Sequence, residues 1–266
     1  MLLKGKVAVI FGGSGAIGTA IAQVFLREGA HVYLCARDLN KLQNIATQLQ
    51  KYEGMVHTVS VDVLDSQATS EAVAQIAQAT SGLDIVINAT SFIHNQGKEI
   101  LELNLDEFVG GINPFLTAQF NISKAAVPFM GGERDGTIIS IVAPSARMAI
   151  PGHLGHIVGC AGIEAFIKAL ASELGPKNIR VLGVRSHAII DAVQAGSYTC
   201  ELFESKAQAM GELSIGQWLE GAAQSTMLKR LPTLSQVAET VAFLASEHAN
   251  SMTATVVNMT AGAIID

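Results

Sequence analysis

The sequence is poor in charged residues, aromatic residues and cysteine, and these shortages exclude several classes of protein. Charged residues make up 15% of the 266 positions, and aromatic residues make up 5%. The net charge of −6 argues against nucleic acid or an anionic membrane as the main partner. No uninterrupted apolar run reaches the roughly 18 residues that a membrane-spanning helix needs. We therefore expect no nucleic-acid partner and no membrane partner.

The three cysteines are Cys35, Cys160 and Cys200. An odd number at wide spacing is typical of reduced thiols and not of a disulfide framework. The N-terminal segment "MLLKGKVAVIFGG" enters a strand pattern at once and leaves no room for a signal peptide. These features favour a cytoplasmic location.

Hydrophobic residues are abundant, at 49%, which is enough for a large core and for contacts between subunits. Short β-branched runs alternate with segments of helical periodicity along the chain. The runs predict strands at Val7–Phe11, Val32–Cys35, Val56–Val59, Ile85–Asn88, Thr137–Ile141, Val181–Val184 and Val256–Asn258. The periodic segments predict helices at Ile17–Glu28, Leu39–Lys51, Ser66–Ala79 and Ser235–Ser246. Such alternation predicts an α/β fold, a Rossmann-type doubly wound parallel sheet, in a single domain over residues 1–266.

The segment 191–227, between the last two predicted strands, interrupts this alternation. It changes from polar to apolar residues and contains the single tryptophan, Trp218. In open α/β sheets, insertions at the carboxyl ends of strands tend to cover the ligand crevice. We predict that this segment is a substrate lid.

The first predicted strand leads into a glycine-rich turn and a helix, in the stretch "VAVIFGGSGAIGTAIA". Gly13, Gly15 and Gly18 have the spacing of the dinucleotide-binding fingerprint. Glycines let the backbone approach a pyrophosphate, which then lies at the helix N-terminus. A tight turn without a ligand is the alternative interpretation. The predicted contacts of this dinucleotide site are Gly12, Ser14, Gly15, Ile17 and Gly18.

The second predicted strand ends in "HVYLCARDLNKL" and bears on the choice of cofactor. An NAD enzyme places an acidic residue at this strand end, whereas a 2′-phosphate requires an arginine. Here the strand end offers Arg37, which favours NADP(H) over NAD(H), with a solvated surface arginine as the alternative. Asp38 is better placed to cap the next helix.

Several further segments resemble the short-chain dehydrogenase/reductase family in its single-domain form. They are "VDVLD" (61–65), "GLDIVINAT", "GGINPF", "GTIISIVAPS" and the C-terminal stretch that begins "LKRLPTLSQVAETVAFLASEHAN". The resemblance covers nearly the whole chain. It implies an oxidoreductase with a nicotinamide cofactor, and a homodimer or homotetramer joined through the helix "GIEAFIKALASELG" (162–175). It also implies cofactor contacts at Asp62, Val63, Asn88 and Ile189.

The catalytic residues of that family are largely replaced in this sequence. The family uses a serine after the fifth strand, a tyrosine thirteen positions later and a lysine four positions after that. The corresponding positions here are Ala143, His156 and Cys160. The resemblance leaves Asn113 as the remaining member of the catalytic tetrad. The family's proline–glycine pair after the sixth strand reads Ser186-His187.

A histidine in place of the tyrosine suggests a different proton donor. Tyrosine, with a pKa near 10, needs a neighbouring lysine at neutral pH, whereas histidine, with a pKa near 6.5, does not. We therefore predict that His156 acts as acid or base, and that Asn113 is the second catalytic residue. Because Ala143 offers no hydrogen bond, polarisation of the substrate needs another donor. The predicted substrate pocket comprises Ser91, Ala143, Ser145, Cys160, His187 and Trp218.

Our first hypothesis is an atypical NADP(H)-dependent oxidoreductase that reduces an activated C=C, C=N or C=O bond of a hydrophobic small molecule. Hydride transfer needs mainly a positioned nicotinamide and an electrophilic acceptor. The alternatives are a catalytically inactive, cofactor-binding pseudoenzyme and a non-redox isomerase or cyclase that uses the same cleft.

The spacing of His153, His156 and Cys160 also permits two less favoured sites. Zinc takes nitrogen and sulfur ligands, but no acidic residue stands nearby to orient them, so we expect no metal. A His156–Cys160 nucleophile pair is possible by spacing, yet spacing alone does not create a thiolate. We expect His94 to be an ordinary surface or loop histidine.

Overall fold

A parallel sheet forms the centre of the molecule in the computed structural model, which describes residues 1–52, 55–192, 195 and 214–266. Within these ranges the sheet has seven strands in the order β3-β2-β1-β4-β5-β6-β7. The strands are β1 (Val7–Phe11), β2 (His31–Ala36), β3 (Val56–Ser60), β4 (Ile85–Asn88), β5 (Gly136–Val142), β6 (Ile179–Ser186) and β7 (Thr255–Met259). This arrangement confirms the predicted single-domain, Rossmann-type fold.

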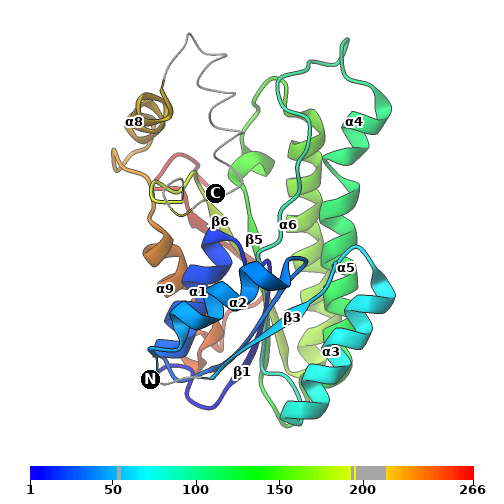
Figure 1. Ribbon diagram of the computed structural model, residues 1–266. Helices are drawn as coiled ribbons and strands as arrows, with labels where there is room; N and C mark the ends of the chain where they lie inside the picture. The colour runs from blue at the N-terminus through cyan, green and yellow to red at the C-terminus, as the bar shows by residue number, and fades with distance from the viewer. Residues whose placement is uncertain (53–54, 193–194, 196–213) are drawn as a thin grey trace.

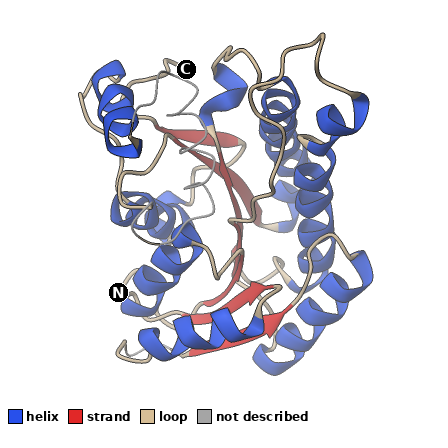
Figure 2. Cartoon of the chain, turned by 45° about the horizontal axis from the view of Figure 1, so that its top comes forward, coloured by secondary structure: helices blue, strands red, loops and turns tan. Residues whose placement is uncertain are grey.

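Helices cover both faces of the sheet (Figures 1 and 2). The first group contains α1 (Ala16–Arg27), α2 (Leu39–Leu49) and α9 (Leu234–Ala245). The second contains α3 (Ser66–Thr80), α5 (Asn113–Ala126) and α6 (Leu154–Leu174). The short helix α4 (Leu105–Gly110) and the helix α8 (Ile215–Ser225) lie at the end of the molecule opposite the N-terminus (Figure 1).

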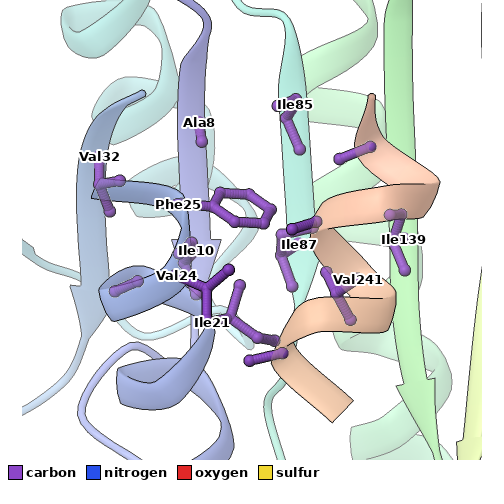
Figure 3. Close-up of a cluster of buried hydrophobic side chains, with 14 of the residues drawn as sticks. Ala8, Ile10, Ile21, Val24, Phe25, Val32, Ile85, Ile87, Ile139 and Val241 are labelled. Atoms are coloured by element: carbon purple, nitrogen blue, oxygen red, sulfur yellow. The ribbon is translucent and has the colours of Figure 1, made fainter. Parts of the chain in front are cut away.

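The core is divided between the two faces because successive side chains of a strand point in opposite directions. On the α1/α9 face, Phe25 of α1 and Val241 of α9 lie over the strands (Figure 3). All five residues of β1 are buried, as expected for a central strand with helices on both faces. Packing of helices on both faces of the sheet thereby fixes the position of β1 and of the glycine-rich loop that follows it.

The sixth strand is longer than predicted. The sequence pattern indicated Val181–Val184, whereas β6 runs to Ser186. The prediction stopped early because Arg185 and Ser186 are polar, yet both are buried, with exposed fractions of 2% and 6%.

A buried ion pair explains how an arginine is accommodated there. Arg185 Nε donates to Glu164 Oε1 of α6 at 2.7 Å, and Glu164 is only 5% exposed. Arg147 contacts the other carboxylate oxygen of Glu164 at 3.4 Å. The side chain of Asp266 accepts a further hydrogen bond from Arg185, which holds the pKa of that carboxyl below its usual range. This charged cluster joins α6 to the end of β6.

The helix α6 and its short extension, Leu154–Lys177, are long and apolar enough to span a bilayer by length and composition. In this fold its residues Ile163 and Ile167 are buried against the sheet, as in a core helix.

Most of the predicted lid lies outside the described residues, since 193–194 and 196–213 are not described. The described remainder of the lid contains α8.

Replacing Arg185 by methionine should lower the free energy of unfolding by about 3 kcal/mol, because it leaves the Glu164 carboxylate buried without its main partner. Urea unfolding followed by circular dichroism measures the change. The control is Arg27→Met, which breaks an exposed ion pair with Glu239 and should cost at most about 1 kcal/mol. Equal losses in the two variants would contradict a structural role for the buried pair.

Candidate active site

The glycine-rich loop after β1 is held tightly between two neighbouring strands. The N–H groups of Gly12 and Gly13 donate to the carbonyl oxygen of Cys35 at 2.9 and 3.1 Å. Gly12 has a φ of +77°, and a Cβ there would lie 2.4 Å from the carbonyl oxygen of Ala89. A Cβ on Gly18 would lie 2.3 Å from the Gly12 carbonyl oxygen. Both positions therefore require glycine for close backbone contact.

The N-terminus of α1 follows this loop and fits an anionic group. Gly15 is the N-cap residue, no side chain caps the helix, and no acidic residue stands in its first turn. Backbone N–H groups at such a terminus attract a phosphate. Gly15 is exposed, and Ser14 and Ile17 are partly exposed beside it. The residues present therefore fit the pyrophosphate of a dinucleotide.

The residues predicted to contact the adenosine part lie at the ends of β2 and β3. The side chain of Arg37 is exposed. Asp38 accepts from Lys41 N at 3.0 Å and caps α2, as predicted. Asp62 is partly exposed, and Val63 is buried, with its carbonyl oxygen accepting from Asn121 Nδ2 at 2.9 Å.

The turn after β4 is fixed by Asn88, which is 3% exposed. Its Oδ1 accepts hydrogen bonds from the backbone N and the hydroxyl of Thr90, at 3.0 and 2.6 Å. Ile189, three residues beyond β6, is buried at 5%.

His156 lies in a group of aromatic rings at the start of α6. Its imidazole stacks on that of His94, with ring centroids 4.0 Å apart and an interplanar angle of 13°. Phe115 of α5 contacts both histidines at centroid distances of 5.6 Å. His94 belongs to a loop, as one of the two expected alternatives had it, but it is 8% exposed and therefore does not lie at the surface.

Cys160 lies one turn after His156 on α6. Its Sγ is 3.6 Å from His156 Nε2, and it takes part in a hydrogen bond with the Ala143 backbone. Burial raises the pKa of the Cys160 thiol to about 12. Ala143, His156 and Cys160, the positions that the resemblance assigns to the family's serine, tyrosine and lysine, thus lie together. The Cys160 thiol is neutral at physiological pH. A neutral thiol weakens the nucleophile-pair interpretation.

Asn113, the other predicted catalytic residue, lies at the start of α5. Its side chain is exposed. The side chain of α5 that packs on His156 is Phe115, which is 8% exposed. The catalytic role of Asn113 stays a prediction.

The other predicted pocket residues are spread along the same end of the fold. Ser145 is buried in the turn Pro144–Arg147, and Ser91 is exposed. His187 Nδ1 accepts from the N–H of Ala188 at 2.7 Å. Trp218 is partly exposed on α8.

A cavity of about 590 Å³ lies against the described part of the lid. Its walls come from α8, from Ile190 and from residues 229–231, and His156 and its ring neighbours do not line it. This cavity is therefore separate from the predicted catalytic residue His156.

His153 precedes α6 as its N-cap residue, as expected from the sequence, and its Nδ1 bonds to the carbonyl oxygen of Pro151 at 2.8 Å. Among the described residues, no group of three or more histidine, cysteine, aspartate or glutamate side chains is arranged to hold a metal ion. The structure therefore offers nothing in favour of the zinc site.

Comparison with known proteins connects this geometry to one family. The model of the short chain dehydrogenase family matches residues 6–195. A 3-oxoacyl-(acyl-carrier-protein) reductase, FabG, of Thermotoga maritima is 26% identical over 272 residues and covers both chains completely. Oxidoreductase UcpA of Salmonella typhimurium is 28% identical, over 95% of this chain and 92% of its own.

Solved structures agree on the fold. L-sorbose reductase of Gluconobacter frateurii, complexed with NADPH and L-sorbose, superposes with a TM-score of 0.86 at 26% identity and full coverage of both chains. An NAD⁺-bound xylitol dehydrogenase superposes with a TM-score of 0.87 over 97% of this chain and 99% of its own. Its identity of 18% supports the fold alone. These neighbours carry different nicotinamide cofactors, so likeness of fold does not choose between NADP and NAD.

The Cys160 thiol should resist alkylation by iodoacetamide at pH 8 in the folded protein. With a pKa of about 12, the reactive thiolate amounts to on the order of one part in ten thousand. Peptide mass spectrometry after timed labelling measures modification at Cys160 itself. The control is the protein unfolded in guanidinium, in which the thiol regains its ordinary pKa and reacts. Rapid labelling in the folded protein would restore the nucleophile interpretation.

Proposed function

Because the chain belongs to the short-chain dehydrogenase family, we propose that it is an NADP(H)-dependent oxidoreductase in which His156 handles the proton. Its substrate is a hydrophobic small molecule with an activated C=C, C=N or C=O bond. The observation that carries this proposal is the grouping of His156 and Cys160 with the Ala143 backbone. A proton donor is thus retained where the serine, tyrosine and lysine are absent.

The cofactor is held by the residues that adjoin the glycine loop. Backbone N–H groups at the start of α1 bind the pyrophosphate, and the Arg37 guanidinium pairs with the 2′-phosphate. When bound, the nicotinamide supplies or accepts a hydride. The proposed contacts are Gly12, Ser14, Gly15, Ile17, Gly18, Arg37, Asp62, Val63, Asn88 and Ile189.

The residues around His156 limit which group can transfer the proton and which substrates can react. A neutral thiol at Cys160 cannot supply the positive charge of a lysine, and Ala143 donates no side-chain hydrogen bond. The proton therefore passes to or from the His156 imidazole, which is partly exposed. Because polarisation of the substrate oxygen is weak, an acceptor that is already electrophilic reacts more easily than a plain ketone. Ser145, Ser91 and His187 are the proposed additional donors, and Trp218 of the lid covers the substrate.

We also propose that the protein forms a homodimer or homotetramer through α5 and α6. Large apolar side chains on these helices are exposed, with fractions of 51% for Phe120, 41% for Leu154 and 40% for Val158. Burying them against a second copy removes apolar surface from water.

Fluorescence or calorimetric titration should show tighter binding of NADPH than of NADH. In Arg37→Ala, NADPH affinity should fall about tenfold or more while NADH affinity changes little, because only the 2′-phosphate contact is lost. The control variant is Lys51→Ala, which removes one positive charge beyond the opposite end of α2. Absence of binding for both cofactors would exclude the oxidoreductase and the pseudoenzyme together.

Screening of activated alkenes, imines and ketones with NADPH tests the role of His156. The variant His156→Ala should lose about a hundredfold or more in kcat on the substrate found, because it lacks the proton donor. NADPH affinity, measured by the same titration, should remain near that of the unmodified protein. Full turnover by His156→Ala would contradict the assignment. Substrate conversion without a change in nicotinamide absorbance would identify an isomerase or cyclase instead.

A further inference from the structure

The stacked histidines are not equivalent, because their hydrogen bonds differ. His94 Nδ1 lies 2.9 Å from the carbonyl oxygen of Phe92, and His94 Nε2 lies 2.8 Å from the amide nitrogen of Gln96. A carbonyl oxygen only accepts a hydrogen bond, so Nδ1 carries a proton and donates it. An amide NH₂ only donates, so Nε2 is unprotonated and accepts. With the Gln96 amide nitrogen facing Nε2, both bonds together require the neutral form of His94.

Stacking links this protonation state to His156. Two imidazolium rings with centroids 4.0 Å apart repel each other, so the pair holds one proton more readily than two. Because the bonds to Phe92 and Gln96 keep His94 neutral, the proton falls to His156. Phe115 contacts both rings and is almost fully buried, which limits their rotation.

We propose that His94 is a positioning residue, a neutral platform that orients the His156 imidazole and leaves His156 as the proton-carrying member of the pair. The catalytic meaning of this arrangement rests on the proposed function of His156. The arrangement itself is a property of the protein without cofactor or substrate. It assigns a role to a loop residue that comes six positions after β4.

Other ionisable groups lie on the helix and in the loop that carry the pair. On α6, Cys160 has a pKa of about 12 and stays a neutral thiol. His153 lies at the start of the same helix. In the loop that carries His94, Lys98 is paired with Glu107 of α4, and Asn95 Nδ2 donates to the same carboxylate at 3.4 Å. The net charge of this Lys98–Glu107 pair is zero, so it does not by itself favour a proton on either imidazole.

Two-bond ¹H–¹⁵N spectra of histidine-labelled protein test the proposal without cofactor, because they report the tautomer and charge of each ring. From about pH 5 to 8, His94 should keep the signature of a neutral ring protonated at Nδ1 while His156 titrates. The variants His94→Phe and His156→Ala assign the signals. Protonation of His94 before His156, with the Gln96 amide turned so that its oxygen accepts, would overturn the proposal.

Variants at position 94 separate positioning from general stability. His94→Ala should lower kcat about tenfold or more at unchanged KM for NADPH, whereas His94→Phe, which retains a stacked ring, should restore most of the loss. The control is His57→Ala, which removes an exposed histidine stacked on Tyr33 at 4.7 Å and should change neither kcat nor the His156 signals. If His94→Ala matches the unmodified protein in kcat and in the His156 spectrum, the proposal fails. Failure of NADPH binding, by contrast, would overturn the proposed function and leave the spectra intact as a separate result.

Discussion

The close approach of the loop after β1 to the end of β4 is the constraint on which the site depends. The strand order reverses between β1 and β4, and in open α/β sheets ligands bind at the carboxyl edge where such a reversal occurs. Gly12 lies at that edge, where a Cβ would come within 2.4 Å of the Ala89 carbonyl oxygen. The same contact joins the loop before α1 to the segment that leaves β4 and continues to His94. The proposed cofactor site and the His156 group therefore share one anchor.

A second constraint fixes α6 against the sheet. His156, Cys160 and Glu164 are spaced four residues apart, so they follow one side of the helix. Glu164 is held by the buried Arg185, while Cys160 meets the Ala143 backbone and His156 meets two aromatic rings. The ion pair anchors the helix one turn beyond the predicted catalytic positions. The Cys160 thiol and the His156 imidazole are thereby held by one packed helix.

The strands and the loop after β1 could be predicted from the sequence, because the strands follow a periodic hydrophobic pattern and the loop requires glycine. The alternation of apolar runs gave strands β1 and β4 at their observed bounds, and the "GGSGAIG" stretch indicated the loop and the start of α1. Asp38 was assigned as a helix cap from its position alone, and the structure confirms it.

Long-range packing was harder to predict, because no local pattern reports it. Arg185 interrupts an apolar run and reads as the end of a strand until Glu164 is placed beside it in space. His94 and Phe115 were missed for the same reason, since they are distant from His156 in sequence. Phe92, four residues beyond β4, was an available signal, because it packs edge-on against Phe115 with ring centroids 5.2 Å apart. Asn113 was selected by resemblance. The residue of α5 that contacts His156 is Phe115, two positions later in the sequence.

A crystal structure of the complex with NADP⁺ tests the central claim most directly, because it locates both ends of the cofactor at once. The account predicts the pyrophosphate at the N-terminus of α1, the 2′-phosphate at Arg37 and the nicotinamide ring beside His156. A nicotinamide bound away from His156, or a 2′-phosphate that avoids Arg37, would contradict it.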